Sequence, residues 1–450
     1  MQDVIILTLY NSELKKVLII TYYWPPSGGV AVQRWVKMSK FLREFGWEPV
    51  IYTAENAEMP VIDRSLEASI PSGITVIKRP IWEPYDLYKR FLGYKKQEKI
   101  GAGFLQEKKK PGVLQKFSVW VRGNFFIPDA RKFWIKPSVK FLTEYLQNNP
   151  VDAIISSGPP HSMHLIAMGV KENLHIPWIA DFRDPWTKID YYQELNLSDY
   201  ADKKHHALEQ KVLRSADKVV TVSKHWASDF NLINNNNTEV ITNGFDEDDF
   251  DKNLIEIDRG FILHHSGMIN KARNPELLWE VLAELCKENE EFNKELKIQL
   301  TGNIDFTVSE SIANNKLQDK LVHIEHLAHN EAVQAMQRSP VLLLLLNDTH
   351  DILGRIPAKL FEYLAAGRPI LVIGNVEGDA AVIIKETNSG VVAEMNNKND
   401  IREKVLLLFD QYKRGQLKIN SAGIEKYARR ENAKNFAKIL DGLYKTSAKI

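Results

Sequence analysis

Two cations and a glycine between an apolar run and a helix form the first candidate for binding a charged ligand. The stretch "HHSGMINKARNP" (264–275) places Gly267, Lys271 and Arg273 ahead of a helix that Asn274-Pro275 would open. Two cations beside a helix N-terminus suit a diphosphate, because the first N–H groups of a helix also attract anions. The alternative is a solvated basic loop. We favour the phosphate interpretation because the elements that follow agree with it.

A further cation lies beside a carboxylate in "ILGRIPAKLFEYLAAGRPILVIG" (352–374). Pro357 can open a helix here, and Gly367 can end it. Lys359 and Glu362 are three residues apart, so they lie on the same side of that helix. This pair would suit a nucleotide, since the cation can bind a phosphate and the carboxylate can bind ribose hydroxyls.

The N-terminal half carries a glycine pair in "TYYWPPSGGVAVQRW" (21–35), directly after the apolar run 17–20. Gly28 and Gly29 stand at the start of a helix, where small residues let backbone N–H groups approach an anion or a sugar. A tight turn is the alternative. The pattern is neither G-x-G-x-x-G nor a P-loop, so a standard dinucleotide or Walker site is not supported.

Two further stretches of this half carry polar side chains where strands should end. In "SSGPPHSMH" (156–164), His161 and His164 are either ligand-facing or on a helix surface, and a spacing of three without a third ligand is weak for a metal. In "DFRDPW" (181–186), Asp184 is placed to accept a hydrogen bond from a substrate hydroxyl. Arg183 is placed to pair with Asp181, Asp184 or phosphate. A local ion pair is the alternative.

Short apolar, β-branched runs alternate with helical periodicity along the whole chain, which favours an α/β fold with parallel sheets covered on both faces. Because there are too many strands for one open sheet, we expect two doubly wound domains, 1–243 and 244–429, with the break near Asn243-Gly244 and a last helix within 430–450. The predicted strands are 16–22, 49–53, 75–77, 153–156, 178–181, 218–222 and 240–242, followed by 261–265, 297–300, 322–325, 341–346, 369–373 and 390–393. Ligands of such sheets bind outside the carboxyl ends of the strands.

Composition bounds the class of protein. The 450 residues are 44% hydrophobic and 26% charged, which is globular composition, and the net charge of +1 gives no global field for nucleic acid. The one cysteine, Cys286, excludes an intramolecular disulfide and a cysteine-based metal cluster, and fits a reducing compartment. No run of 18 apolar residues occurs, and Asp3 with no basic region argues against a signal peptide. We expect a cytoplasmic protein.

One segment departs from this balance. Residues 89–122, within a predicted basic and aromatic insertion at 86–126, hold ten Lys or Arg and two acids. This composition fits a contact with a membrane surface, which would make the protein peripheral, and it fits a solvated surface loop equally well. A third charged stretch, "DEDDFD" (246–251), has spacing that suggests a divalent metal site, but its place after an Asn-Gly turn favours an acidic helix start.

Taken in order, these stretches make the chain resemble the retaining glycosyltransferases of the GT-B fold, family 4, over residues 15–445. The pieces that carry the resemblance are "YYWPPSGGVAVQRW", "SGPPHSMHLIA", "DFRDPW", "ITNGFD", "SGMINKARNPELL" and "PAKLFEYLAAGRPIL". The resemblance implies two Rossmann-like domains facing across a cleft, an acceptor-binding domain at 1–243, a nucleotide-sugar-binding domain at 244–429 and a last helix that crosses back. It implies no metal and no other cofactor.

The same resemblance assigns roles to residues. We expect the donor, a nucleoside-diphosphate sugar, to be bound by Gly28, Gly29, Gly267, Lys271, Arg273, Gly302, Arg355, Lys359 and Glu362. The residues expected at the reaction centre are Asp184, Arg183 and His161. The expected acceptor is a glycan or a lipid-linked glycan, in the synthesis of a surface polysaccharide.

The chain departs from the family pattern at three places. Gly354 replaces the first motif glutamate, which normally contacts the transferred sugar, Met268 stands where an arginine is frequent, and the end of the "DFRD" strand lacks a frequent histidine. Two other functions therefore stay open: a GT-B-type sugar-nucleotide epimerase, and a non-catalytic protein that binds sugar nucleotides.

Overall fold

The computed structural model describes residues 14–59, 61–83, 113–235, 237–251, 255–347, 352–417 and 421–447. The chain forms two compact units. Unit 1 comprises residues 1–222, 226–242 and 429–450, and unit 2 comprises 223–225 and 243–428. The predicted basic and aromatic insertion at 86–126 lies largely outside the described residues, which begin again at 113.

Unit 1 is built on a parallel sheet whose strand order is β3-β2-β1-β4-β5-β6-β7. The strands are β1 (Lys15–Ile20), β2 (Trp47–Ala54), β3 (Thr75–Arg79), β4 (Ala153–Gly158), β5 (Trp178–Phe182), β6 (Lys218–Thr221) and β7 (Thr238–Val240). Successive apolar residues of β1 serve opposite faces, since Val17 and Ile19 join one core and Leu18 and Ile20 join the other. This two-sided burial is why the strand reads as one apolar run.

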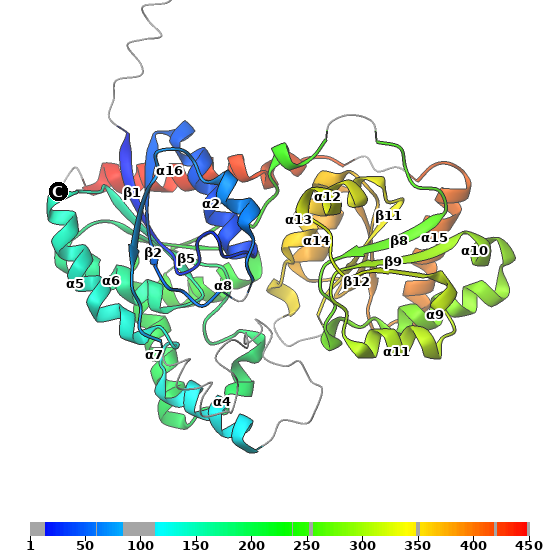
Figure 1. The fold of residues 1–450 in the computed structure, drawn as a ribbon, viewed down its shortest axis with the longest axis horizontal. Helices are drawn as coiled ribbons and strands as arrows, with labels where there is room; N and C mark the ends of the chain where they lie inside the picture. The colour runs from blue at the N-terminus through cyan, green and yellow to red at the C-terminus, as the bar shows by residue number, and fades with distance from the viewer. Residues whose placement is uncertain are drawn as a thin grey trace, which may run out of the picture. The chain divides into compact units, whose positions relative to one another are not determined.

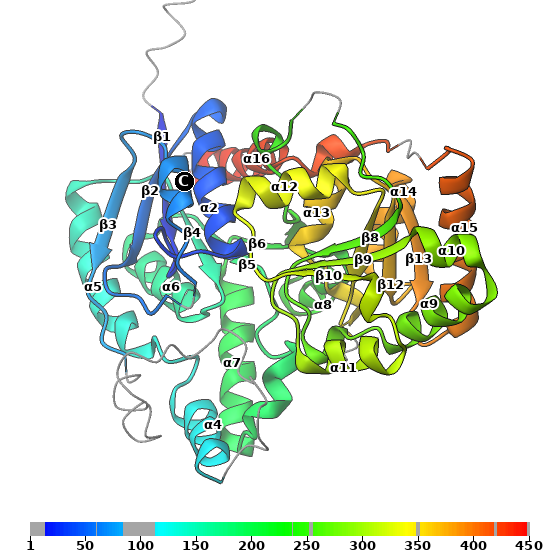
Figure 2. The same ribbon diagram turned by 45° about the vertical axis from the view of Figure 1, so that its right-hand side comes forward.

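Helices cover both faces of this sheet (Figures 1 and 2). The helices of unit 1 are α2 (Val30–Leu42), α4 (Val113–Phe125), α5 (Lys132–Asn148), α6 (Ser162–Leu174), α7 (Asp199–Ser215), α8 (Lys224–Asn234) and α16 (Arg429–Ser447). Of these, α4 packs on α7 and on residues 190–195 instead of on the sheet. Residues of α2 and α16 pack on the Val17 face, and residues of α5 and α6 pack on the Leu18 face. The ring centroids of Trp35 and Phe436 lie 5.5 Å apart, so the last helix completes the core of unit 1.

Unit 2 repeats the plan with the strand order β10-β9-β8-β11-β12-β13. Its strands are β8 (Phe261–Ser266), β9 (Leu296–Thr301), β10 (Leu321–Ile324), β11 (Val341–Leu345), β12 (Ile370–Gly374) and β13 (Gly390–Glu394). Its helices are α9 (Glu276–Glu288), α10 (Glu290–Glu295), α11 (Phe306–Asn314), α12 (His329–Arg338), α13 (Ala358–Ala366), α14 (Asp379–Thr387) and α15 (Lys398–Lys413). In both sheets the first strand is central and the connections reverse direction beside it.

Short 3₁₀ helices complete the described elements: η1 (Arg43–Phe45), η2 (Arg64–Ser69), η3 (Asp190–Leu195), η4 (Glu247–Asp249), η5 (Lys271–Arg273), η6 (Gln318–Lys320), η7 (Ile352–Gly354) and η8 (Ile424–Tyr427). The predicted α/β class with two doubly wound sheets is confirmed. Each predicted strand is found, with ends that differ by at most two residues. The largest shift is in β7, which lies at 238–240 instead of 240–242.

Candidate functional site

In unit 2, the candidate site lies at the carboxyl ends of β8 and β11. The connections from these neighbouring strands leave in opposite directions, and such a switch point is where ligands of doubly wound sheets bind. Gly267 follows β8, Gly302 follows β9, and Asn347 lies two residues beyond β11. The first residues of α13 reach the same place, because a Cβ on Gly267 would lie 4.0 Å from Cγ of Lys359.

Gly267 and Gly302 cross at very short range. Both have positive φ angles, 146° and 116°, and a Cβ on Gly302 would lie 2.5 Å from the carbonyl oxygen of Gly267. Their N–H groups donate to Thr301 and Ile324, each over 2.8 Å. The two glycines are therefore required by the backbone crossing, and what they offer a ligand is space rather than free donors.

Lys359 and Glu362 lie on one side of α13, as the spacing predicted. Lys359 Nζ and Glu362 Oε2 are 2.5 Å apart, with side chains 32% and 15% exposed. Pro357 precedes the helix as its N-cap residue, and Gly367 ends it in the left-handed conformation with φ of 66°. The cation and the carboxylate are thus adjacent, partly accessible and paired with each other.

The two cations after Gly267 differ in their surroundings. Lys271 is exposed at the start of η5. The Arg273 guanidinium donates to the side-chain oxygen of Asn347 and, over 3.3 Å, to the carbonyl oxygen of Met268. Arg273 therefore joins the β8 loop to the end of β11, which fixes a positive charge at these strand ends.

His265 is a residue of this site to which the sequence reasoning assigned no role, although its stretch was singled out. Its Nδ1 lies 3.0 Å from the carbonyl oxygen of Leu343, so Nδ1 carries the proton and Nε2 is an acceptor. Nε2 is buried without a hydrogen-bond partner among the described residues and lies 3.5 Å from a Cβ built on Gly267. Burial lowers the pKa of His265 to about 3, so the ring is neutral.

The acidic stretch 246–251 begins a helical turn, as favoured. Asp246 accepts a hydrogen bond from the Asp248 backbone and caps η4. Asp249 accepts from His329 Nε2 over 3.3 Å, and this hydrogen bond raises the pKa of His329. Within the described ranges, no group of three His, Cys, Asp or Glu side chains is placed to hold a metal ion.

In unit 1, the loop after β1 brings its glycines to the start of α2, but they behave differently from each other. Gly28 donates its N–H to Val61 over 2.9 Å, and a Cβ there would lie 2.9 Å from Cβ of Asp63. Its N–H is therefore committed to the turn and does not face an anion, which corrects the expectation for this donor. Gly29 is exposed, has φ of 102° and is the N-cap residue of α2.

His161 and His164 are buried, so a helix-surface position is wrong for both. His164 Nδ1 lies 2.8 Å from Ser156 Oγ, and the His161 ring stacks on Trp186 with centroids 4.8 Å apart. Burial lowers the pKa of both rings, to about 3 for His164. Both imidazoles are therefore neutral at pH 7, at the carboxyl end of β4.

Arg183 is held by a chain of buried polar groups. Its Nε donates to Ser157 Oγ over 3.0 Å, and its guanidinium also donates to the carbonyl of Pro159. Ser157 in turn donates to Asp181, which forms an ion pair of 3.0 Å with Arg34. Asp181 thus pairs with Arg34 rather than with Arg183, and the half-buried Asp184 lies close enough to Arg183 to raise its pKa against the effect of burial.

Arg355 is half-buried one residue after η7, and Gly354, at the position of the missing motif glutamate, is buried.

Arg34, which lies in unit 1, was missed by the sequence reasoning. The available signal was an arginine among the apolar positions of a predicted helix, and its partner is 147 residues away.

Two family models match the chain in succession. The model described as Glycosyltransferase Family 4 matches residues 105–249, and the model described as Glycosyl transferases group 1 matches residues 246–429. Together they cover more than half of the chain. This chain is a GT-B glycosyltransferase of group 1 and family 4.

Several solved structures share the fold of this glycosyltransferase. HepE of Anabaena, in complex with UDP and glucose, is 12% identical with a TM-score of 0.55, covering 97% of this chain and 98% of that one. A variant of S. aureus TarM, in complex with UDP and alpha-GlcNAc-glycerol among others, is 12% identical with a TM-score of 0.58, covering 96% and 100%. A putative UDP-N-acetylglucosamine 2-epimerase from Listeria monocytogenes is 10% identical with a TM-score of 0.52, covering 96% and 97%. No curated protein matches the chain in sequence.

Because the fold is shared with an epimerase, the family models rather than the fold favour transfer.

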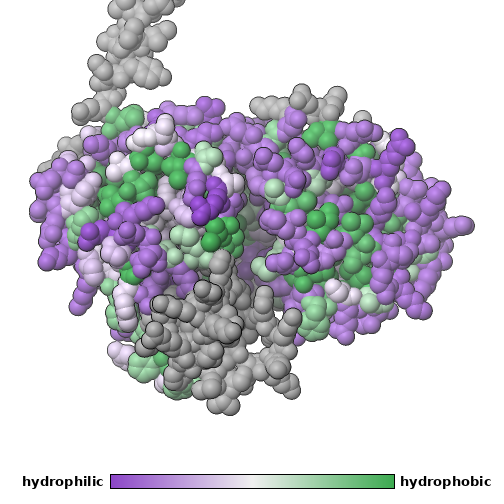
Figure 3. Space-filling model, in the orientation of Figure 1, coloured by the Kyte–Doolittle hydropathy of each residue, from purple (hydrophilic) through white to green (hydrophobic). Residues whose placement is uncertain are grey.

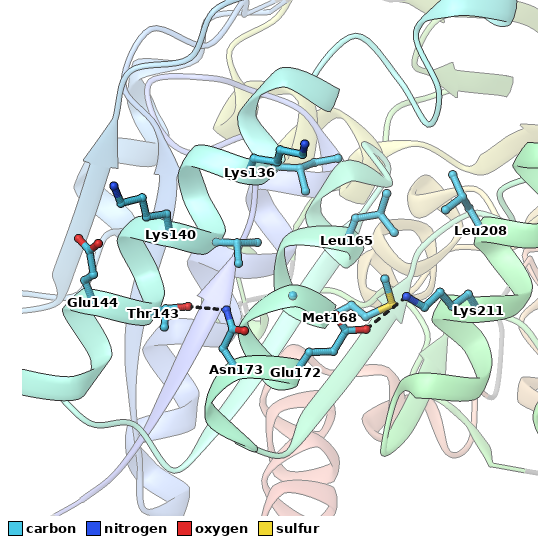
Figure 4. A pocket seen from close by; sticks show the side chains of 13 residues that line it. Lys136, Lys140, Thr143, Glu144, Leu165, Met168, Glu172, Asn173, Leu208 and Lys211 are labelled. Carbon is cyan, nitrogen blue, oxygen red and sulfur yellow. Dashed lines mark hydrogen bonds and ion pairs between the residues drawn. The ribbon is translucent and has the colours of Figure 1, made fainter.

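The glycosyltransferase also has a groove of about 580 Å³ between α5, α6 and α7 (Figure 4). None of the predicted site residues lines it, and it lies over the helices instead of at the carboxyl ends of the strands. In the described residues, no helix is long and apolar enough to cross a membrane.

Proposed function

We propose that this glycosyltransferase moves a sugar from a nucleoside-diphosphate sugar to a hydroxyl of a glycan or lipid-linked acceptor, with retention of the anomeric configuration and without a metal ion. The observation that carries the proposal is the Lys359–Glu362 pair beside Gly267, His265 and Arg273 at the strand ends of unit 2. We place the enzyme in the synthesis of a surface polysaccharide or glycolipid.

The donor would exchange partners within this pair. Its diphosphate would replace Glu362 as the partner of Lys359, with Arg273 and Lys271 adding positive charge. Glu362, released from Lys359, would then accept hydrogen bonds from the two ribose hydroxyls. Charge-assisted hydrogen bonds of this kind are about twice as strong as neutral ones. Gly302 would leave room beside Gly267, and we assign Arg355 to the same ligand.

The reaction depends on stabilising the negative charge of the departing diphosphate more than on a basic side chain of the protein. The bond between the anomeric carbon and the phosphate oxygen breaks, and the electron pair stays on the diphosphate. Fixed cations stabilise that developing charge. The acceptor oxygen forms the new bond to the anomeric carbon, and its proton passes to a phosphate oxygen. Lys359 and Arg273 supply this positive charge, which is why we propose metal-independent transfer.

Residues of unit 1 would handle the acceptor. We assign Asp184 to accept a hydrogen bond from an acceptor hydroxyl and Arg183 to hold an anionic group. His161 is neutral and so suits hydrogen bonding to a hydroxyl better than holding a charge. Gly29, at the exposed start of α2, lets the ligand approach the backbone, whereas Gly28 shapes the turn.

The test is a panel of UDP-, GDP- and ADP-sugars scored by thermal shift and by slow hydrolysis. One donor should raise the melting temperature, since a ligand at 100 times its Kd stabilises by about 2.7 kcal/mol. Glu362→Gln should weaken that donor about 10- to 100-fold, because a hydrogen bond to a charged group contributes about 1.5–3 kcal/mol. Glu310→Gln, at an exposed position of α11, is the matched control and should bind like the wild type.

The panel also separates the alternatives. An epimerase would release free sugar without an acceptor and would change its configuration at C2. A non-catalytic protein would show the thermal shift but no hydrolysis or transfer. If no nucleotide sugar moves the melting curve, the proposed function is wrong.

A further inference from the structure

Helix α4 turns aromatic side chains outward. Phe117, Trp120 and Phe125 are exposed, the last by 59%. The side of α4 that faces the protein carries small residues instead: Ser118 is buried, and a Cβ on Gly123 would lie 2.7 Å from a methyl group of Leu197. A surface helix normally buries its large apolar side chains and exposes polar ones. This reversed arrangement marks the outer side of α4 as a contact surface.

Neighbouring aromatic rings extend this surface to the start of α5. Trp82, which is 61% exposed, lies with its ring centroid 4.8 Å from that of the exposed Phe133. Lys132 donates to the carbonyl oxygen of Phe125 over 2.6 Å, which ties the end of α4 to α5. Figure 3 shows hydrophobic side chains at the lower edge of unit 1, where Figure 1 places α4. We call Trp82, Phe117, Trp120, Phe125, Phe133 and the lysines of α5 the aromatic-basic face.

Those lysines form a row along α5. Lys132, Lys136 and Lys140 follow one another at four-residue spacing, so they share one side of the helix, and the last two are exposed. Lys136 and Lys140 also border the groove, whose floor includes Leu165 and Met168 (Figure 4). Figure 4 draws both lysines at the rim of the groove, with Lys140 on the side of Glu144. Their long apolar stems let such lysines reach from an apolar layer to a charged one.

Few acids offset this charge. Residues 113–140 contain six Lys or Arg and one acid, Asp129. The Asp129 carboxylate points inward, since it accepts hydrogen bonds from the backbone and the hydroxyl of Ser162 over 2.9 and 2.8 Å. Arg131 is also turned inward, in a buried ion pair with Glu83 over 3.0 Å. Beyond this segment, the exposed Glu144 and Glu172 border the groove, and Glu172 is paired with Lys211 over 3.2 Å. The outward charge of residues 113–140 is therefore positive, and it lies beside the exposed Trp120.

We propose that the aromatic-basic face binds the surface of an anionic lipid bilayer. Tryptophan rings are favoured at the boundary between headgroups and acyl chains, and each lysine near an anionic membrane gains about 1 kcal/mol. A second copy of this chain is a poorer occupant, because the same face would bring two lysine rows together. This proposal is independent of the sugar chemistry.

The face is connected to residues of the proposed acceptor site. The carbonyl of Gly123 in α4 accepts from His205 Nε2 over 3.3 Å, and His205 Nδ1 accepts from Trp186 over 3.0 Å. Trp186 stacks on His161. If the proposed function holds, an acceptor carried by the same membrane would be presented to the side of unit 1 that bears His161.

The experiment is vesicle sedimentation of the full chain without sugar ligands. Vesicles of phosphatidylglycerol and phosphatidylcholine in equal parts should bind the protein, and phosphatidylcholine alone should bind it far less. The double variant Lys136→Gln/Lys140→Gln should bind about 25-fold more weakly, which is about fivefold per lysine. Its control, Lys287→Gln/Lys294→Gln, neutralises two exposed lysines of unit 2 and should bind like the wild type.

The aromatic part is tested separately. Trp120→Ser should weaken binding to anionic vesicles, and the loss should persist at high salt, whereas Phe306→Ser, at an exposed position of α11, should not. Wild-type protein that fails to prefer anionic vesicles overturns the proposal, and so do test variants that bind like their controls. A dimer in light scattering that Trp120→Ser converts to a monomer, with no vesicle binding, would assign the face to self-association instead.

Discussion

Replacing Asp181 by asparagine should destabilise unit 1 strongly and leave unit 2 unchanged. The carboxylate and the Arg34 guanidinium are 3.0 Å apart, and their side chains are 0% and 1% exposed. Asparagine keeps the shape but removes the negative charge. Arg34 would then have only neutral acceptors, the carbonyls of Ile241 and Thr242 and one amide oxygen for which Ser157 competes.

The magnitude follows from burial. Removing one partner of a buried ion pair typically costs about 3–5 kcal/mol, because the other charge stays out of water without compensation. Ser157 now donates to the Asp181 carboxylate over 2.9 Å, and in the variant it would have to donate to the amide oxygen of asparagine. The matched exposed pair is Lys211 with Glu172, at 3.2 Å and more than half exposed on both sides. For Glu172→Gln we expect less than about 1 kcal/mol.

The assay is urea unfolding followed by far-UV circular dichroism, with tryptophan fluorescence to separate the two units. For a urea dependence of about 3 kcal/mol per molar, the unit 1 midpoint of Asp181→Asn should fall by about 1 M or more. Adding Arg34→Met should recover part of the loss, since the uncompensated charge is then gone. A midpoint shift no larger than that of Glu172→Gln would refute the reasoning, as would a double variant whose loss equals the sum of the two single losses.

Two more predictions concern the buried histidines and the backbone crossing at Gly302. Burial lowers the pKa of His164 and His265 to about 3 and that of His264 to about 4, from about 6.5 in an unfolded chain. These rings are therefore neutral in the folded protein, and only the unfolded chain gains protons as the pH falls. Their contribution to the free energy of unfolding is complete above about pH 7 and decreases below about pH 6.5, with a loss of about 2 kcal/mol per ring at pH 5. The melting temperature should therefore fall steeply from pH 6.5 to 5. A flat profile would contradict the burial of these rings. Gly302→Ala should destabilise unit 2 by about 1–3 kcal/mol and suppress the donor-induced thermal shift, because its φ of 116° and the Gly267 carbonyl at 2.5 Å exclude a methyl group. Gly442→Ala, whose Cβ meets nothing within 4 Å, is the control and should melt at or above the wild-type temperature.

Local pattern was enough to predict the strands, the two sheets and the helix boundaries that matter for the site. Burial on both faces makes each parallel strand a short apolar run, and this signal is contained within a few residues. The same holds for Lys359 and Glu362, since a separation of three residues places two side chains together in any α-helix. Gly367 ends its helix where predicted, because its left-handed backbone is a local requirement.

Contacts between distant segments decided the rest. The sequence left His161 and His164 either ligand-facing or on a helix surface, and the packing of Phe182 and Trp186 buries them. The N–H of Gly28 is taken by Val61, and Arg34 pairs with Asp181 on another strand. His265 acquires its tautomer only from a carbonyl 78 residues later. The sequence by itself determined which elements form and which short-range pairs they carry, because these depend on backbone period and local burial. Only the tertiary structure decided which polar groups lose water and which partner each one meets, because those depend on strand order across the sheets.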